Sequence, residues 1–74
     1  MIIRNMIKCK QCGDIIESKS VHDFVPCKCF IESGGGKGCA VDGGHDYLRR
    51  IGYSEEIEEL SIIKNDKGEE VPVK

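Results

Sequence analysis

The sequence predicts a small, β-rich domain whose fold is completed by a bound metal ion. The chain has 74 residues, 39% of them hydrophobic and none of them tryptophan, so its apolar core is thin for the entropy lost on folding. Five cysteines occur in this short length, and turn residues separate its apolar segments, as in β-hairpins. We therefore expect one domain over residues 1–74, a zinc ribbon with β-hairpins: a ribbon core over 6–52 and a C-terminal hairpin or tail over 54–74.

The spacing of four cysteines carries the strongest signal. Cys9 and Cys12 form a C-x2-C pair followed by Gly13, and Cys27 and Cys29 form a C-x-C pair 14 residues later. Tetrahedral Zn²⁺ requires four soft ligands about 2.3 Å away, and two closely spaced pairs on facing turns supply them. Gly13 allows the positive φ that closes a tight turn around the metal. The four cysteines are the predicted zinc ligands.

Other uses of these cysteines fit less well. A disulfide framework needs an oxidising compartment, no export signal is visible, and five is an odd number of thiols. A redox-active C-x-x-C motif needs a βαβ context that this chain lacks, and nothing in the sequence suggests electron transfer by an iron–sulfur cluster. Two residues compete for a place among the zinc ligands, Cys39 and His22. We expect Cys39 to be a free thiol in a glycine-rich insertion, dispensable for folding.

The first half of the chain is expected to form a strand and a hairpin. Residues 1–7 are mostly apolar and suit a short strand that leads into the first cysteine turn. Residues 15–17 leave that turn, 18–20 reverse the chain, and 21–25 return to the second cysteine pair as the other strand of a hairpin. The glycine-rich segment 32–38 is expected to be a flexible surface loop.

The second half is expected to contain two further hairpins. Residues 40–51 form the first, since the Asp42-Gly43 step favours the turns that hairpins use. Ser54 followed by Glu55 resembles a helix start, so a short turn or helical cap is expected over 54–59. Residues 60–73, with an Asn-Asp-Lys-Gly turn at 65–68, form the last hairpin.

Charge disfavours a nucleic-acid partner, and hydropathy excludes a membrane span. Residues 1–37 carry six basic and four acidic side chains (net +2), and residues 38–74 carry five and nine (net −4). An acidic chain is a poor non-specific binder of nucleic acid, although Lys8, Lys10, Lys28 and Lys37 could form a local basic spot. Apolar runs are pairs and triplets, so we expect neither a membrane span nor a signal peptide, and a cytoplasmic location.

No catalytic site is expected, and the protein is predicted not to be an enzyme. The glycine run 34–38 lacks the spacing and the Ser or Thr of a phosphate-binding P-loop. A Cys39 nucleophile activated by His45, with Asp46 beside it, would need a substrate cleft that so short a chain hardly provides. Asp42 is expected to satisfy the N–H groups of its own turn.

Several motifs together resemble small uncharacterised zinc-ribbon proteins of bacteriophages and Gram-positive bacteria. They are the C-x2-C-G turn at Cys9, the HDF string from His22, Cys27-x-Cys29, and VDGGHDYLRR over 41–50. The resemblance covers residues 4–63. It departs where Phe30 replaces a glycine and about seven extra residues, including Cys39, intervene. The resemblance implies a phage-borne protein that binds and inhibits a bacterial protein, as a host-takeover or anti-defence factor, in the host cytoplasm.

The expected function is a zinc-stabilised protein-interaction module, and a nucleic-acid-binding zinc ribbon is the alternative. The expected partner is a bacterial protein or a second copy of the chain, and no membrane is involved. The partner-binding residues are expected on the hairpin around the Asp-Gly-Gly turn, where an imidazole, a phenol and charged groups cluster: His45, Asp46, Tyr47, Arg49 and Arg50.

Overall fold

Strand β1 organises the fold. The computed structural model describes residues 1–73, and β1 (Ile2–Cys9) is its longest element. Its alternate residues Asn5, Ile7 and Cys9 are buried, the pattern of a strand with one face toward a core. β1 lies within a sheet of order β2-β1-β7-β8, and β6 also pairs with it. The other strands of this sheet are β2 (Ile15–Ser18), β6 (Ile57–Glu59), β7 (Ile62–Lys64) and β8 (Glu70–Pro72).

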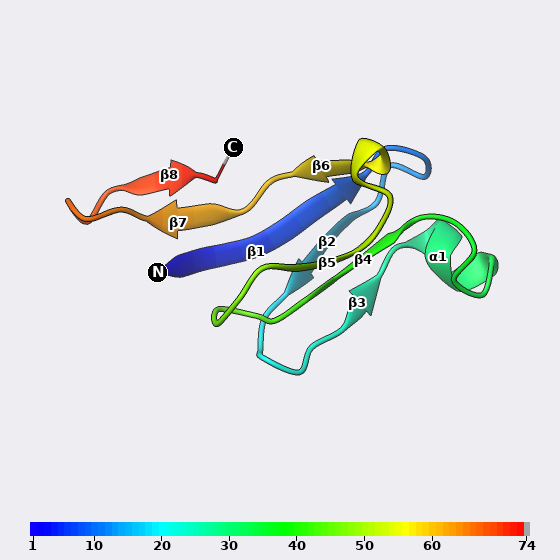
Figure 1. The fold of residues 1–74 in the computed structure, drawn as a ribbon, viewed down its shortest axis with the longest axis horizontal. Coiled ribbons are helices and arrows are strands. Elements are labelled where there is room, and N and C mark those ends of the chain that lie inside the picture. The colour runs from blue at the N-terminus through cyan, green and yellow to red at the C-terminus, as the bar shows by residue number, and fades with distance from the viewer. Residues whose placement is uncertain (74) are drawn as a thin grey trace.

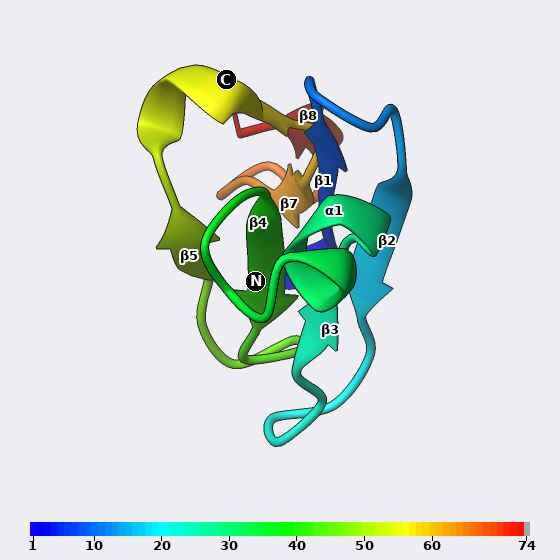
Figure 2. The same cartoon turned by 90° about the vertical axis from the view of Figure 1, so that its right-hand side faces the viewer.

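A second, three-stranded sheet has the order β3-β4-β5 and packs against the first (Figure 2). Its strands are β3 (Val25–Pro26), β4 (Cys39–Asp42) and β5 (Arg49–Gly52). The core lies where the two sheets meet, and its buried members come from both: Ile7, Cys9, Ile16, Cys27, Cys39 and Val41. All neighbouring strands run antiparallel, with Asp42 opposite Arg49 in the β4–β5 hairpin.

The molecule is elongated, with principal extents of 42 × 23 × 15 Å. Helix α1 (Lys28–Glu32) lies at one end, and the β7–β8 hairpin projects at the other (Figure 1). A single 3-10 turn, η1 (Ser54–Glu56), precedes β6. No helix among residues 1–73 is long and apolar enough to cross a bilayer.

The predicted class, a small β-rich domain with β-hairpins, is confirmed, and three predicted elements are present. The N-terminal strand exists and extends to Cys9. The hairpin over 40–51 is β4–β5, with Asp42 Oδ1 accepting the N–H of Gly43 at 2.8 Å, as expected for a turn aspartate. The last predicted hairpin is β7–β8, whereas the turn or helical cap predicted over 54–59 is present only over 54–56 as η1, because residues 57–59 form strand β6 on β1.

The hairpin predicted between the two cysteine pairs is wrong. β2 pairs with β1, and Val25–Pro26 pairs with β4, so the two halves of the predicted hairpin belong to different sheets. Side chains stabilise the intervening turn: Ser18 Oγ donates to the carbonyl of Asp23 at 2.6 Å, and Asp23 Oδ2 accepts the N–H of Lys19 at 2.9 Å. These local bonds take the place of hydrogen bonds between the two predicted strands. β2 pairs with β1 instead, because β1 presents a long apolar face.

The glycine-rich segment lies at the surface as predicted, since residues 32–37 are exposed and only Gly38 at its end is buried. Its first residue, Glu32, ends α1, and the segment folds back by hydrogen bonds: the N–H of Gly35 donates to Phe30 O, and that of Lys37 to Ser33 Oγ. Cys39 is not a loop residue. It begins β4 and is completely buried, because β4 is the central strand of its sheet.

Candidate metal centre

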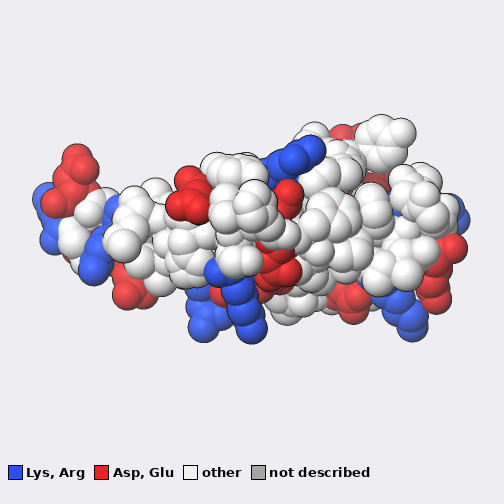
Figure 3. All heavy atoms as spheres, turned by 90° about the horizontal axis from the view of Figure 1, so that it is seen from below, with Lys and Arg blue, Asp and Glu red and all other residues white. Residues whose placement is uncertain are grey.

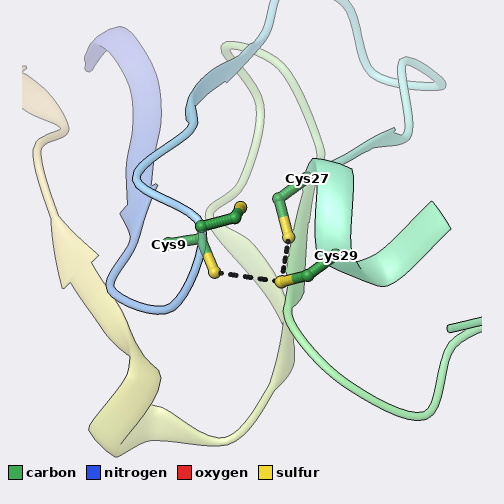
Figure 4. Close-up of side chains that lie close together, drawn as sticks. Cys9, Cys27 and Cys29 are labelled. Atoms are coloured by element: carbon green, nitrogen blue, oxygen red, sulfur yellow. Dashed lines mark hydrogen bonds between the residues drawn. The ribbon is translucent and has the colours of Figure 1, made fainter. Parts of the chain in front are cut away.

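Two turns bring four cysteines together at the α1 end of the molecule. Cys9 ends β1 and Cys12 lies in the β1–β2 turn, while Cys27 precedes α1 and Cys29 lies in its first turn. All four sulfur atoms lie within 4.8 Å of one another. The sulfur of Cys29 is 3.5 Å from that of Cys9 and 3.4 Å from that of Cys27 (Figure 4). The structure therefore brings together the four residues that the sequence singled out.

The donor set fits a metal ion. A tetrahedral ion with ligands at about 2.3 Å requires sulfurs roughly 3.8 Å apart, close to the two separations above. All five cysteines are free thiols, so none of the four is engaged in a disulfide. Four thiolates suit Zn²⁺ and other thiophilic ions and leave no position open for a substrate. These residues thus form a cluster that could hold a metal ion.

Local hydrogen bonds shape the first turn and attach it to the second. The N–H of Gly13 donates to Cys9 O at 2.8 Å, and Gly13 has a φ of 78°, a left-handed conformation that favours glycine. Asp14 then links the turns, because its Oδ2 accepts the N–H of Lys28 at 2.8 Å. This bond fixes α1 against the first cysteine pair.

Backbone N–H groups point at the sulfurs of Cys12 and Cys27 and stabilise their thiolates. Hydrogen bonds from the backbone of Cys29 and Asp14 lower the pKa of Cys12 to about 6. Burial alone would raise the pKa of Cys27, but the N–H groups of Cys39 and Phe30 outweigh it and hold that pKa below its usual range. The N–H of Cys39 lies 3.3 Å from Cys27 Sγ. Such bonds are typical of thiolate ligands in metal sites.

Gly38 closes the cluster on the side of the glycine-rich segment. It is buried with a φ of 80°, and a Cβ built there would lie only 2.6 Å from the sulfurs of both Cys27 and Cys29. No side chain fits at this distance. The segment that the sequence assigned to a surface loop therefore ends against the cysteine cluster.

Neither of the two alternative ligands, Cys39 and His22, belongs to the cluster of four cysteines. Cys39 packs in the core beside Cys9 and Cys27, but its sulfur is outside the set that lies within 4.8 Å. Desolvation raises the pKa of the Cys39 thiol. His22 is exposed in the turn between β2 and β3 and is also outside the set.

The predicted partner-binding residues lie at the far end of the β4–β5 hairpin. His45, Asp46 and Tyr47 are exposed in its connecting loop, and His45 Nδ1 lies 3.0 Å from the carbonyl oxygen of Ile2. Arg49 is exposed as well, with NH1 3.8 Å from Asp42 Oδ2. These four residues are accessible on the surface.

Arg50 must be corrected, because its side chain is directed inward. Its guanidinium forms a two-pronged ion pair with Glu59, at 2.9 and 2.6 Å, and also donates to Asn5 Oδ1 at 2.6 Å and Ser61 Oγ at 2.7 Å. Burial opposes ionisation of Glu59, but the bonds from Arg50 and then Ser61 hold the pKa of Glu59 below its usual range. The side chain of Arg50 thus joins β5 to β6.

Asn5 is a key residue that the sequence reasoning missed. It is completely buried, and its Nδ2 lies within hydrogen-bond distance of three carbonyl oxygens of the hairpin loop, those of Asp42, Gly44 and Tyr47, at 2.9 to 3.1 Å. The available signal was an uncharged amide in the middle of a mostly apolar strand, at a position that alternates with Ile7 and Cys9. The VDGGHDYLRR motif is thus anchored from inside by β1.

The structure does not bring Cys39 and His45 together as a nucleophile and its activating base. Cys39 packs beside Cys9, at the end of β1, whereas His45 contacts Ile2 at the beginning of the same strand. A nucleophile and a base must lie within hydrogen-bond reach of each other. Cys39 and His45 therefore do not form such a pair.

Comparison with known proteins places the chain in a family of unknown role. The family described as "Domain of unknown function (DUF7695)" matches residues 1–52, which include the four clustered cysteines and the β4–β5 hairpin. No curated protein and no solved structure matches the chain significantly. The family match covers most of the sequence, and the chain belongs to the DUF7695 family.

Proposed function

We propose that the protein is a zinc-stabilised protein-interaction module with a zinc-ribbon type of metal centre. The observation that carries the proposal is the convergence of four cysteine sulfurs within 4.8 Å, from two different turns. The first pair projects from a β-hairpin turn, as the ribbon interpretation requires, and the second from the turn before α1.

A structural role for zinc follows from how little apolar side chain is buried. The fully or nearly fully buried hydrophobic residues are Ile7, Cys9, Ile16, Cys27, Cys39, Ala40 and Val41. Three of these are cysteines and one is alanine, so few aliphatic side chains remain to stabilise the fold. Binding of structural Zn²⁺ contributes about 10–16 kcal/mol in small peptides. A closed four-thiolate site is the type that serves folding rather than catalysis.

The interaction surface in this proposal is the exposed part of the β4–β5 loop, with His45, Asp46, Tyr47 and Arg49. Tyr47 is 45% exposed, and tyrosine and arginine are enriched where proteins bind one another. On the face seen in Figure 3, basic and acidic side chains are interspersed among large uncharged areas. Nucleic-acid binding calls for clustered lysines and arginines, so this face favours a protein partner.

The metal is tested by native mass spectrometry of the protein and its cysteine variants. We expect one zinc ion per chain, and we expect Cys9→Ser, Cys12→Ser, Cys27→Ser and Cys29→Ser each to lose it. Cys39→Ser is the matched control: it should retain one zinc but melt at a lower temperature, because a buried thiol is replaced by a hydroxyl. A folded, reduced protein without metal would contradict the proposal.

The interaction surface is tested by affinity capture from bacterial lysate, with nuclease added to remove nucleic acid. Arg49→Glu should lose the captured protein while zinc content and melting temperature stay unchanged. Arg4→Glu is the control, since Arg4 is comparably exposed on β1. Equal capture by both variants, or capture that depends on nucleic acid, would contradict this placement.

A further inference from the structure

The two sheets are separated by a seam on one side. β5 is an edge strand of the three-stranded sheet, and β6 is paired along one edge only, to β1. Between the two strands is a hollow of about 410 Å³, lined by Arg50, Gly52, Ser54, Ile57, Glu59 and Val73. Hollows of about 300–1,000 Å³ are the usual size of ligand sites.

The main chain of β5 presents polar groups to this hollow. The N–H of Cys27 donates to Cys39 O and the N–H of Cys39 to Cys27 Sγ, so the polar groups of Cys39 face the β3 side of β4. Those of the next residue, Ala40, therefore face β5, where Ala40 pairs with Ile51. Because direction alternates along a strand, the N–H and C=O groups of Arg50 and the N–H of Gly52 point away from β4.

The same reasoning applies to β6. The N–H of Leu60 donates to Met6 O and that of Lys10 to Glu56 O, so even-numbered residues of β1 face β6. Lys8 then forms the hydrogen-bonded pair with Glu58. The polar groups of Glu59 and the C=O of Ile57 point away from β1, while the N–H of Ile57 donates to Ser54 O.

The backbone groups that point away from each sheet belong to residues that line the hollow. Arg50, Gly52, Ile57 and Glu59 both line it and turn main-chain donors or acceptors toward it. Within residues 1–73, the backbone N–H groups of Arg50, Gly52 and Glu59 have no partner across the seam. The hollow is thus bounded on both sides by unpaired strand edges.

We infer that this seam binds an extended segment of a partner protein, which adds as a strand between β5 and β6. A polypeptide backbone supplies alternating donors and acceptors to both edges, and an aliphatic side chain of the segment would contact Ile57 and Val73. The charge of Arg50 is already paired with Glu59, and Glu55 and Glu58 are exposed nearby, so the seam does not favour a phosphate. This inference deepens the proposed interaction role and rests on it.

The experiment uses a library of random heptapeptides displayed on phage, selected on the zinc-loaded protein. Enriched peptides are synthesised, and hydrogen exchange of individual amides is measured by NMR with and without them. We expect at least tenfold slower exchange at the N–H groups of Arg50, Gly52 and Glu59. The amides of Ile51 and Glu58 are internal controls, because they already pair with β4 and β1.

A variant that fills the seam sharpens the test. Ser54 lines the hollow and is exposed, so Ser54→Trp should weaken peptide binding at least tenfold without unfolding the protein. The matched control is Glu55→Trp, one residue further and outside the lining, which should leave affinity unchanged. N-methylation of alternate peptide amides should also weaken binding, since it removes main-chain donors.

The inference is overturned if no peptide is enriched, if bound peptides leave the three amides unprotected, or if Ser54→Trp and Glu55→Trp behave alike. Protection of these amides by a single-stranded oligonucleotide instead of a peptide would overturn it as well. Zinc content and Arg49-dependent capture are measured on the same samples. If zinc content and Arg49-dependent capture are as expected while peptide binding fails, peptide binding at the seam is refuted but the proposed interaction module is not.

Discussion

At the scale of single residues, the absence of a side chain at Gly38 keeps the cysteine cluster intact. Its left-handed φ of 80° already favours glycine, but the decisive constraint is space, because two sulfurs lie only 2.6 Å from the position of a Cβ. Gly34, in the same segment, has a similar φ of 66° and no atom near its Cβ position. Comparing the same substitution at the two glycines therefore separates the effect of backbone strain from that of a steric collision.

We predict that Gly38→Ala lowers zinc affinity at least tenfold, whereas Gly34→Ala leaves it unchanged. Both variants place alanine in a left-handed conformation, which costs about 1–2 kcal/mol, so both should melt somewhat earlier. Competition with a chromophoric zinc chelator measures the affinities. Equal zinc affinity in the two variants would show that the contact with Cys27 and Cys29 is unimportant.

A second residue-scale prediction concerns the two neighbouring arginines. Arg50→Ala should destabilise the fold by about 3 kcal/mol, because it leaves the largely buried carboxylate of Glu59 without its partner. Arg49→Ala should cost less than about 1 kcal/mol, since its side chain is 61% exposed and its contact with Asp42 is long. Urea unfolding of the zinc-loaded proteins measures both, and a reversed order would contradict the inward placement of Arg50.

At the scale of elements, the β4–β5 hairpin depends on β1. Its turn is encoded in part locally, because Asp42 Oδ1 accepts the N–H of Gly43 and a Cβ at the left-handed Gly43 would collide with the backbone of Tyr47. The left-handed Gly44 is required by a distant contact, since a Cβ there would collide with the backbone of Ser20. Two contacts hold its loop against β1: the Asn5 amide reaches three loop carbonyl oxygens, and His45 Nδ1 lies 3.0 Å from Ile2 O. The loop that displays the proposed partner surface is thus held from below by residues of another strand.

Asn5→Ala is predicted to destabilise the protein by about 2–4 kcal/mol. A buried carbonyl group that loses its hydrogen-bond donor costs about 1–3 kcal/mol, and three loop carbonyl groups share the Asn5 amide as their donor. NMR should show the largest shifts at the amides of residues 42–47. Arg4→Ala, at the neighbouring exposed position, should cost less than about 1 kcal/mol. Small shifts confined to β1 would mean that the loop is positioned without Asn5.

At the scale of the whole molecule, few buried apolar side chains connect the two sheets, and the cysteine cluster connects them at one end. Residues from β1, from the β1–β2 turn and from the start of α1 meet there. The opposite end, with β7 and β8, adds to the first sheet and is remote from this centre (Figure 1). Metal binding and folding should therefore be coupled.

We predict that a zinc chelator unfolds the protein and that added Zn²⁺ restores it. A domain is normally stable by only about 5–15 kcal/mol, and the free energy of zinc binding is of the same size. Circular dichroism should show loss of the strand signal as zinc leaves. An unchanged, cooperative melting transition in the chelated protein would refute the coupling.

The sequence by itself determined features that depend on short-range chemistry. The C-x2-C-G and C-x-C spacings each placed two sulfurs close together, and Asp42-Gly43 and Asn65–Gly68 encoded turns that formed as expected: the N–H of Gly68 donates to Asn65 O at 3.0 Å. These signals act within a few residues, so nothing distant needs to be known. The strand over 1–7 followed from its apolar residues for the same reason.

The tertiary structure alone decided which strands pair and which side chains turn inward. β2 pairs with β1 and not with the segment 21–25, and Cys39 is buried because β4 is the central strand of its sheet. The sequence suggested a surface position for Arg50, but in the fold its guanidinium binds Asn5, 45 positions away, and Glu59. Strand pairing and burial are settled by competition among contacts distant in sequence, and residue spacing along the chain does not encode that competition.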